Sequence, residues 1–441
     1  MKRKLIFIFL ILGLVSIVCA VQYPFKINTS LSCLTFFNLN TSTTYPLLKL
    51  DNSGNASLNS ISYTNVLNLQ NGSIAMNGKS VQFEKLHSYP RNNTLKYLAT
   101  INDRGSHGSI IIGSDGLPLI VSRNGTGYDL SIIKCFDLNC NTFKDTFLAG
   151  TLIEMGRQGS IAVDTDGLPI VKYVNNSKVW IYKCSTLDCS KGVNRFIGAI
   201  GVPISGYNYP KIFINGDGNP FFFEKNVTSG KLISFRCMDI NCSSTQRSIF
   251  GLVNYAYGST GLLGSDGYPI ISYVTTPGYI NVTKCNNYNC SLSSSVKINA
   301  YPVQQYITMV IAKDGLPLLF FYNLSGVRSI KCNNLNCSSN TITNLGITGV
   351  GLYPDAKMLP SGLPIVISTS TAATYVSYMH CNNYNCSKAQ VTKPTTQSSS
   401  FTSMTVGVDG LPMIVFQNST QLNLGFIKCG SEFCLPYWTR R

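Results

Sequence analysis

Fourteen of the sixteen cysteines form seven pairs with one shared spacing, in which four residues separate the two thiols. The pairs are Cys135/Cys140, Cys184/Cys189, Cys237/Cys242, Cys285/Cys290, Cys332/Cys337, Cys381/Cys386 and Cys429/Cys434, and the other two cysteines are Cys19 and Cys33. A zinc site usually adds a second thiol pair or histidines, and the chain has three histidines. The pattern therefore predicts seven local disulfides, with neither a metal nor a cofactor.

An acidic and a basic position repeat in phase with the cysteines. An Asp-Gly-x-Pro motif begins at Asp115, Asp166, Asp217, Asp266, Asp314 and Asp409, and Ser361 replaces the Asp once. The residue before each pair's first cysteine is Lys134, Lys183, Arg236, Lys284, Lys331 and Lys428, and it is His380 in the unit of Ser361. Because both positions change together, we expect an ion pair inside each unit. A basic ring that binds anionic polymers is the alternative.

Catalytic chemistry finds little support in the residue types. The histidines His87, His107 and His380 lie far apart in the chain, and Glu154 and Asp355 are the carboxylates expected near the loop face. A glycosidase needs two converging carboxylates, and no motif indicates such a pair. Whether the protein is an enzyme stays open, with a non-enzymatic role favoured.

A mostly aromatic position precedes the motif by about eight residues. Tyrosine combines a flat apolar ring with a hydroxyl, which suits contact with sugars and peptides. The ligand-binding residues predicted at or beside this position are His107, Arg157, Tyr209, Tyr257, Tyr306, Tyr353 and Phe401. The same rings would also serve to pack neighbouring repeats together, and the sequence leaves both interpretations open.

One repeat of about 49 residues is expected to form four short strands. In the first repeat these are 109–112, 118–122, 130–135 and roughly 142–148. Asp115-Gly116 predicts a tight hairpin with positive φ at both residues, and Pro118 is tolerated at the start of a strand. The Cys-x4-Cys pair staples the turn between the third and fourth strands.

Four-stranded units of this length are typical of propeller blades. We therefore predict an all-β fold, a seven-bladed β-propeller of antiparallel blades, with an open β-solenoid as the alternative. The last repeat lacks a clear fourth strand, which the segment Thr94–Ile101 can supply. The predicted domains are a signal peptide at 1–20, a β-rich or irregular extension at 21–93, and the propeller at 94–441.

The repeats resemble those of exported, functionally uncharacterised propeller-repeat proteins of bacteria and archaea. The clearest match runs from Gly264 to Tyr273 and continues with Lys284-Cys285 and Cys290. The likeness covers about residues 100–435. It implies the fold and an exported location, and it transfers no catalytic residue.

Basic Met1–Lys4, followed by an apolar run to Val18, is typical of an export signal. The net charge of +16 is scattered rather than clustered, which disfavours nucleic-acid binding. Sequons at Asn124, Asn175, Asn226, Asn323 and Asn418 follow the second strands.

Together these features predict an extracellular or cell-surface binding or adhesion protein. It has no membrane span after signal cleavage, and it binds a glycan or protein ligand at the tyrosine-rich face. Alternatives are a secreted carbohydrate-active hydrolase or lyase and a structural surface-layer or filament subunit. The oligomeric state is not predicted.

Overall fold

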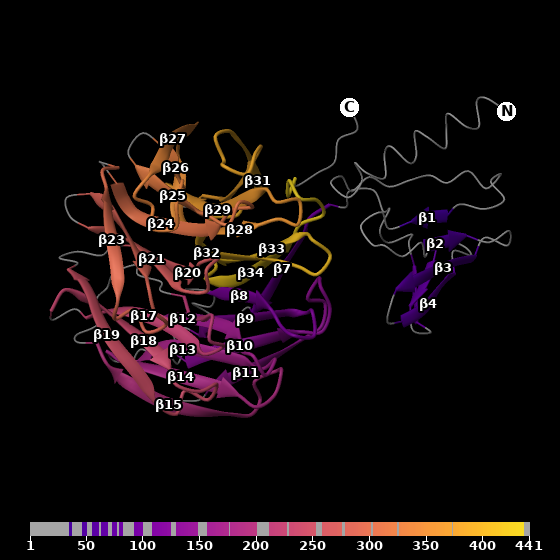
Figure 1. Ribbon diagram of the computed structural model, residues 1–441, viewed down its shortest axis with the longest axis horizontal. Coiled ribbons are helices and arrows are strands. Elements are labelled where there is room, and N and C mark those ends of the chain that lie inside the picture. The colour runs from indigo at the N-terminus through magenta and orange to yellow at the C-terminus, as the bar shows by residue number, and fades with distance from the viewer. Residues whose placement is uncertain are drawn as a thin grey trace. The chain divides into compact units, whose positions relative to one another are not determined.

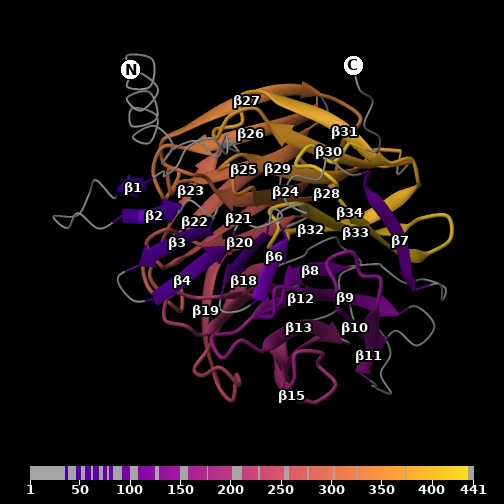
Figure 2. The ribbon, with the colours of Figure 1, turned by 90° about the vertical axis from the view of Figure 1, so that its right-hand side faces the viewer.

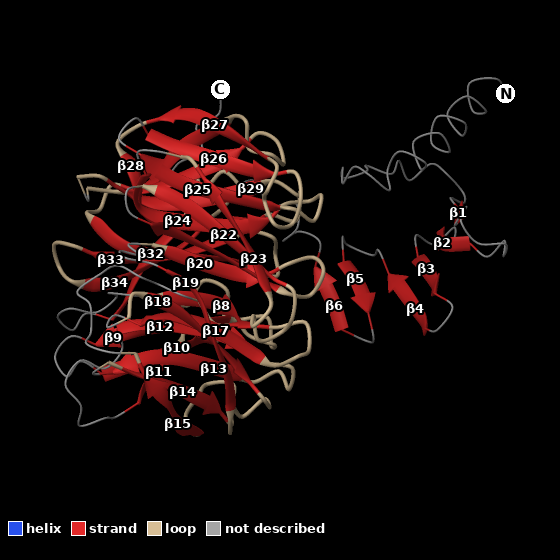
Figure 3. Cartoon of the chain, turned by 60° about the vertical axis from the view of Figure 1, so that its left-hand side comes forward, coloured by secondary structure: helices blue, strands red, loops and turns tan. Residues whose placement is uncertain are grey.

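The computed structural model divides into two units, residues 1–89 and residues 90–441. The structure describes residues 35–37, 46–50, 55–60, 63–68, 73–76, 79–82, 92–99, 108–124, 129–148, 157–175, 177–200, 211–226, 229–252, 258–275, 278–300, 303–323, 326–372 and 374–435. The expected signal peptide and Cys33 lie outside these residues. Within them, every regular element is a β-strand (Figure 3).

The first unit contains a four-stranded antiparallel sheet and a separate hairpin. The sheet consists of β1 (Thr35–Phe37), β2 (Pro46–Leu50), β3 (Asn55–Ser60) and β4 (Tyr63–Asn68). The hairpin consists of β5 (Ser73–Met76) and β6 (Lys79–Gln82).

The second unit is a seven-bladed propeller, in which each blade is a four-stranded antiparallel sheet. The first strands of blades one to seven are β8 (Ser109–Ile112), β12 (Arg157–Val163), β16 (Phe213–Ile214), β20 (Ser259–Leu263), β24 (Val303–Ile311), β28 (Val350–Met358) and β32 (Ser399–Val406). Each first strand contacts the first strands of the blades on either side, β32 and β8 included. These strands therefore lie innermost in the propeller (Figure 1), and residues from all seven line a central channel.

The second and third strands follow the motifs seen in the sequence. The second strands begin at the motif's proline, and they are β9 (Pro118–Asn124), β13 (Pro169–Asn175), β17 (Pro220–Asn226), β21 (Pro269–Thr275), β25 (Pro317–Asn323), β29 (Pro364–Ser370) and β33 (Pro412–Asn418). The third strands end at or next to the first cysteine of each pair, and they are β10 (Asp129–Cys135), β14 (Lys178–Cys184), β18 (Lys231–Cys237), β22 (Tyr279–Cys285), β26 (Gly326–Cys332), β30 (Val376–Cys381) and β34 (Asn423–Lys428).

The fourth strands form the outer edges of the blades. They are β11 (Phe143–Leu148), β15 (Gly192–Ala199), β19 (Thr245–Leu252), β23 (Ser293–Ile298), β27 (Asn340–Ile347), β31 (Ala389–Thr395) and β7 (Thr94–Ala99). In blades one to six the fourth strand follows the Cys-x4-Cys turn directly along the chain.

All seven predicted disulfides are present, with Cα–Cα distances of 4.7–4.9 Å. They join Cys135 to Cys140, Cys184 to Cys189, Cys237 to Cys242, Cys285 to Cys290, Cys332 to Cys337, Cys381 to Cys386 and Cys429 to Cys434. Each bridge lies at the turn beside the outer strand, where an edge strand would otherwise separate easily.

The second cysteine of every pair has a conformation that the sequence analysis did not predict. Each is left-handed, with φ between 48° and 60°, and donates its N–H to the carbonyl three residues earlier at 3.0–3.2 Å. These residues are Cys140, Cys189, Cys242, Cys290, Cys337, Cys386 and Cys434. Residues other than glycine seldom adopt a positive φ, so the bridge and the hydrogen bond hold a conformation that the spacing alone does not reveal.

Strand β7 comes from the N-terminal side of the repeats and completes blade seven. It pairs antiparallel with β34, from Thr94 opposite Lys428 to Ala99 opposite Leu424. Figures 1 and 2 show this purple strand beside the yellow strands of the last blade. The ring is therefore closed by residues from both ends of the repeat region, which excludes the open solenoid.

Apolar clusters hold neighbouring blades together. Among the described residues there are seven such clusters, one for each junction between blades. At the closing junction, Val415 and Phe426 of blade seven cluster with Ile120 and Ile133 of blade one, and all four are fully buried. Complete burial of a side chain of this size stabilises a fold by roughly 1.5–3 kcal/mol.

The Asp-Gly turn differs from the sequence prediction in one respect. Gly116 has a φ of 79°, whereas the φ of Asp115 is not positive. The N–H of Gly113 donates to the carbonyl of Leu117 at 2.9 Å, so the loop contains three residues. A three-residue loop needs one left-handed residue, whereas the two-residue loop expected from the sequence needs two.

Candidate functional site

One residue from each blade meets at the same level of the central channel. The position lies six residues before the Asp of the turn motif, or before Ser361 in blade six. It holds Ser109, Ser160, Lys211, Thr260, Thr308, Asp355 and Ser403. All seven line one cavity of about 70 Å³, at the end of the channel where the first strands begin. We call this set the channel ring; five of its members are hydroxyl residues.

The two charged members of the channel ring form an ion pair across the channel. Lys211 Nζ contacts Asp355 Oδ1, and Lys357, two residues further along β28, places its Nζ 3.7 Å from the same oxygen. The other oxygen of Asp355 accepts hydrogen bonds from Ser403 Oγ at 3.1 Å and from the Met404 N–H at 2.9 Å. Both carboxylate oxygens of Asp355 therefore have partners.

The enclosed position of this cluster shifts its protonation equilibria. Burial opposes ionisation of Asp355, but Lys211, Lys357 and the Met404 N–H outweigh it and lower the pKa of the carboxyl group from 3.8 to about 2. Burial lowers the pKa of Lys357 from 10.5 to about 8; Lys211 adds to this effect and Asp355 opposes it. Each lysine side chain is about one third exposed. Lys211 lines both channel cavities, and Lys357 lines the larger one.

An aromatic wall of Tyr306, Tyr353 and Phe401 lines the same cavity. The ring centroids of Tyr306 and Tyr353 are 5.0 Å apart, and those of Tyr353 and Phe401 are 4.6 Å apart. The rings therefore pack on one another across blades five, six and seven while they also face the cavity. The packing between blades that the sequence allowed for this position is therefore present, whereas ligand binding by these rings stays a prediction.

Backbone irregularities place these rings. The pairing of β28 with β29 shifts register between Leu352 and Asp355, and that of β32 with β33 shifts between Ser400 and Ser403. Tyr353 and Phe401 lie in these bulges with φ of 50° and 51°. Left-handed conformations are unfavourable for bulky residues, and bulges of this kind redirect a side chain beside a site.

Below the channel ring the channel becomes largely apolar. A cavity of about 420 Å³ shares five of the ring residues and is lined mostly by aliphatic side chains. Four residues before the turn motif's Asp, blades one to five carry Ile111, Ala162, Phe213, Leu262 and Val310. Lys357 occupies this position in blade six, so it is a cation in apolar surroundings.

The other predicted ligand-binding residues fall outside this description. His107, Tyr209, Tyr257 and the carboxylate candidate Glu154 lie outside the described residues, and Arg157 is described only as part of β12. Three of the seven predicted ligand-binding residues are therefore seen to share a cavity. Lys211 and Lys357 were not predicted from the sequence. An alignment of the repeats shows that Lys211 stands six residues before the motif, where most repeats have Ser or Thr, and that Lys357 stands four residues before it, where blades one to five have apolar residues.

The disulfide cysteines have a structural role and take no part in this site. No cysteine is among the described residues that line the two channel cavities. The second cysteines of the pairs are at most 1% exposed, which leaves their sulfur atoms inaccessible to a ligand; they are Cys140, Cys189, Cys242, Cys290, Cys337, Cys386 and Cys434. The bridges therefore support the outer edges of the blades, away from the channel.

The repeated acidic and basic residues form ion pairs on the turn side of the blades. Lys284 Nζ lies 2.8 Å from Asp266, and equivalent pairs join Asp115 to Lys134, Asp166 to Lys183, Asp217 to Arg236, Asp314 to Lys331 and Asp409 to Lys428. The expected ion pair within each unit is confirmed in six blades. These cations are bound to their own turns, so they do not form a free basic ring.

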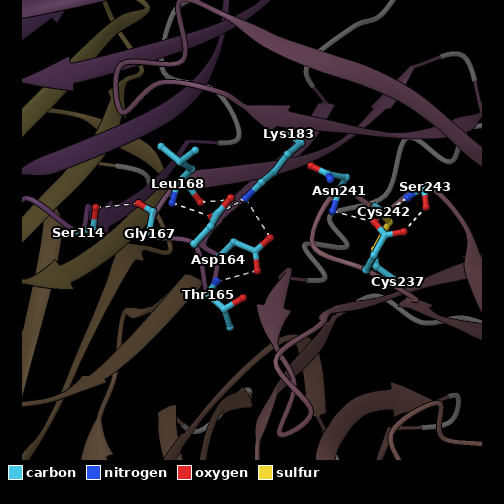
Figure 4. Close-up of polar contacts among 12 residues, drawn as sticks. Ser114, Asp164, Thr165, Gly167, Leu168, Lys183, Cys237, Asn241, Cys242 and Ser243 are labelled. Carbon is cyan, nitrogen blue, oxygen red and sulfur yellow. Dashed lines mark hydrogen bonds and ion pairs between the residues drawn. A yellow bond between two sulfur atoms is a disulfide. The ribbon is translucent and has the colours of Figure 1, made fainter.

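Figure 4 shows Lys183 of blade two, which also contacts Asp164 at 3.0 Å. Asp164 and Asp166 resemble the start of a calcium loop in sequence, and here both bind one ammonium group. Ser114 Oγ donates to the carbonyl of Gly167 at 2.7 Å, which joins the turns of blades one and two. Figure 4 also shows the cross-linked turn of Cys237 and Cys242.

Blade six replaces the ion pair with an aromatic contact. His380 is 3% exposed, and its ring centroid lies 4.4 Å from that of Phe433. Burial is the main cause that lowers the pKa of His380 below 6.5. The loss of Asp at Ser361 and the change of Lys to His380 thus belong to one local rearrangement.

Three of the sequon asparagines that were expected after the second strands are instead the last residues of β13, β25 and β33, and they are buried. Asn175, Asn323 and Asn418 are 3%, 0% and 1% exposed. The folded blades leave no room for a glycan on these side chains, so these three are not candidate glycosylation sites. Within the described residues, no helix is long and apolar enough to cross a membrane.

No family model and no curated protein matches the chain. Among solved structures, a protein of unknown function from Dyadobacter fermentans has a TM-score of 0.45 and 10% identity over 77% of this chain and 98% of that chain. A mutant of the NanB sialidase from Streptococcus pneumoniae has a TM-score of 0.42 and 13% identity over 80% and 73%. BBS1N in complex with ARL6DN has a TM-score of 0.48 and 9% identity over 79% and 98%. At these values the likenesses say nothing about function.

Proposed function

We propose that this protein is an exported binding protein that holds a saccharide at the mouth of its central channel. The observation that carries the proposal is the convergence of two kinds of surface on one cavity. The aromatic wall of Tyr306, Tyr353 and Phe401 lies beside the five hydroxyl residues of the channel ring.

A saccharide fits this combination better than a purely apolar ligand does. The C–H face of a sugar ring packs on aromatic rings, whereas its hydroxyl groups need hydrogen-bonding partners. Pockets that combine aromatic side chains with a few converging polar groups are typical of small-ligand sites. Serine and threonine hydroxyls both donate and accept, so they match the hydroxyl groups of a sugar.

The proposed location is extracellular or at the cell surface. Seven disulfides are consistent with an oxidising compartment, because cytosolic thiols are kept reduced. The basic and apolar N-terminal sequence is the second support, since it is typical of an export signal.

A binding role is favoured over hydrolysis by the state of Asp355. It is the one carboxylate among the described residues that line the cavity. Two lysines, a hydroxyl and a backbone N–H already bind it. Glycosidases usually need a pair of carboxylates, one of which is protonated. The lowered pKa of Asp355 opposes that role.

Binding of the mature chain to an array of neutral and acidic saccharides tests the proposal. Tyr353→Ala is expected to weaken binding about tenfold, because it removes a stacking ring. Tyr384→Ala is the matched control, because Tyr384 is 46% exposed on the disulfide turn of the same blade. The proposal would be contradicted if no saccharide bound, or if Tyr353→Ala and Tyr384→Ala weakened binding equally.

A further inference from the structure

The charges of the described residues that line the channel do not balance. Among the described residues that line the channel ring and the apolar cavity below it, the charged side chains are Lys211, Asp355 and Lys357. Two ammonium groups therefore share one carboxylate. The remaining members of the channel ring are hydroxyl residues, and the neighbours of Lys357 at its own level are aliphatic or aromatic in blades one to five.

An uncompensated cation is costly in such a place. Enclosed charges are normally paired, because protein surroundings solvate them less well than water does. The lowered pKa of Lys357 reflects this cost, yet with a value of about 8 the group is still mostly protonated at neutral pH. The described residues that line the channel therefore carry an excess of one positive charge under ordinary conditions.

Both ammonium groups lie against the same oxygen of Asp355. They are therefore close enough for one further small anion to contact both of them. A carboxylate suits this position, because its two oxygens can each accept a charge-assisted hydrogen bond. Ser109, Ser160 and Thr260 line both channel cavities, and their hydroxyl groups can also donate to such an anion.

We propose that the channel selects a saccharide bearing one carboxylate group, of the uronic-acid type, whose carboxylate is bound by Lys211 of the channel ring and by Lys357 below it. This inference rests on the proposed saccharide-binding function and adds the chemical class of the ligand. One negative charge matches the excess charge, and the sugar ring would contact the aromatic wall. Inorganic phosphate carries more charge and lacks a ring to pack against Tyr353.

The test compares matched saccharides that differ in one group. Oligosaccharides that end in glucuronate or galacturonate are compared with those that end in glucose or galactose, by calorimetry on the full mature protein. The acidic partner of each pair is expected to bind about tenfold more tightly, the usual scale of a charge-assisted hydrogen bond. Inorganic phosphate is measured as a separate probe.

Lys357→Met is the decisive variant. It removes the excess charge but keeps the buried ion pair of Lys211 with Asp355, so the fold is expected to survive. Lys313→Met is the control, because Lys313 is exposed and immediately precedes the turn motif of blade five. The preference for acidic over neutral saccharides should disappear in Lys357→Met and persist in Lys313→Met.

Three other outcomes would contradict the ligand class, the proposed function or both. Equal binding of acidic and neutral saccharides would refute the charge selection and leave the proposed function standing. Tighter binding of inorganic phosphate than of either acid would also refute the assigned ligand class. Failure of every saccharide to bind would refute the proposed function together with this inference.

Discussion

Lys211 and Asp355 meet across the channel although 144 residues separate them in the sequence. They belong to blades three and six, which lie on opposite sides of the ring. This pair therefore ties the two halves of the propeller together at the cavity, and it allows the first prediction.

Asp355→Asn is expected to destabilise the protein and to change its response to acid. The pKa of the folded carboxyl group is lowered from 3.8 to about 2, which corresponds to about 2 kcal/mol of stabilisation. Because the folded pKa is the lower one, this stabilisation is present above about pH 4 and is lost as the pH falls towards 2. Urea unfolding at pH 7, 4, 3 and 2 measures it. Asp314→Asn, in a part-exposed pair, is the control, and identical acid profiles of the two variants would refute the prediction.

Binding of acidic saccharides is expected to weaken at alkaline pH. With a pKa of about 8, Lys357 is about nine-tenths protonated at pH 7 and about one-tenth protonated at pH 9. A bound carboxylate stabilises the ammonium form, so the loss of affinity lies somewhat above pH 8. Calorimetry between pH 7 and pH 10 should show a several-fold decrease that is absent in Lys357→Met. An equal decrease in that variant would show that another group titrates.

Substitutions at Asp266 separate its two roles. Its carboxylate pairs with Lys284 at 2.8 Å and accepts the N–H of Tyr268 at 3.2 Å. The carboxylate is 36% exposed, so the ion pair should contribute only about 0.5 kcal/mol. Asp266→Asn keeps an acceptor for the turn and should lose about that amount. Asp266→Ala also loses the hydrogen bond and should cost about 1 kcal/mol or somewhat more. Equal costs in urea unfolding would show that the turn hydrogen bond contributes nothing.

His380 should make the protein less stable in mild acid. Its folded pKa lies below 6.5 because burial disfavours the charged ring. The unfolded chain therefore takes up a proton first as the pH falls through 6.5, and stability decreases in the window just below that value. The melting temperature is expected to fall between pH 7.5 and pH 5.5 by more in the parent protein than in His380→Phe. The opposite order would contradict a buried, neutral histidine.

The disulfides are open to direct mapping. Peptides from the exported protein, digested without reduction, should contain seven bridges, each within one Cys-x4-Cys turn. Replacing both Cys285 and Cys290 by serine should cost about 2 kcal/mol, the chain-entropy value for so short a loop. Free thiols in the mature protein would contradict this pattern.

The repeat made the architecture predictable from the residues. Asp-Gly-x-Pro and Cys-x4-Cys recur in constant phase, so they mark the same turns in every blade, and hydrogen bonding between strands is local. The turn conformation was harder, because Asp115-Gly116 fits a two-residue loop and a three-residue loop equally well. The choice depends on how the flanking Gly113 and Leu117 pair. The left-handed backbone at Cys140 and its equivalents was likewise hidden, because cysteine carries no preference for that conformation.

The site was predictable only in part. Aligning the repeats placed Tyr306, Tyr353 and Phe401 at a shared position, and they share a cavity. The pairing of Lys211 with Asp355 depends on the diameter of the closed ring and on which side chain reaches across it. No local pattern in the sequence contains that information. The sequence shows only that Lys211 and Asp355 stand at a position where the other repeats have Ser or Thr.

Strand β7 has a consequence for the biosynthesis of the protein. Asn93, just before it, hydrogen-bonds through its side chain to the carbonyl of Cys434, 341 residues later in the chain. A ribosome makes β7 before any blade exists, and its partner β34 emerges last. Strand β7 therefore cannot take its place in blade seven until the last repeat has been synthesised, and closure of the ring requires both ends of the repeat region.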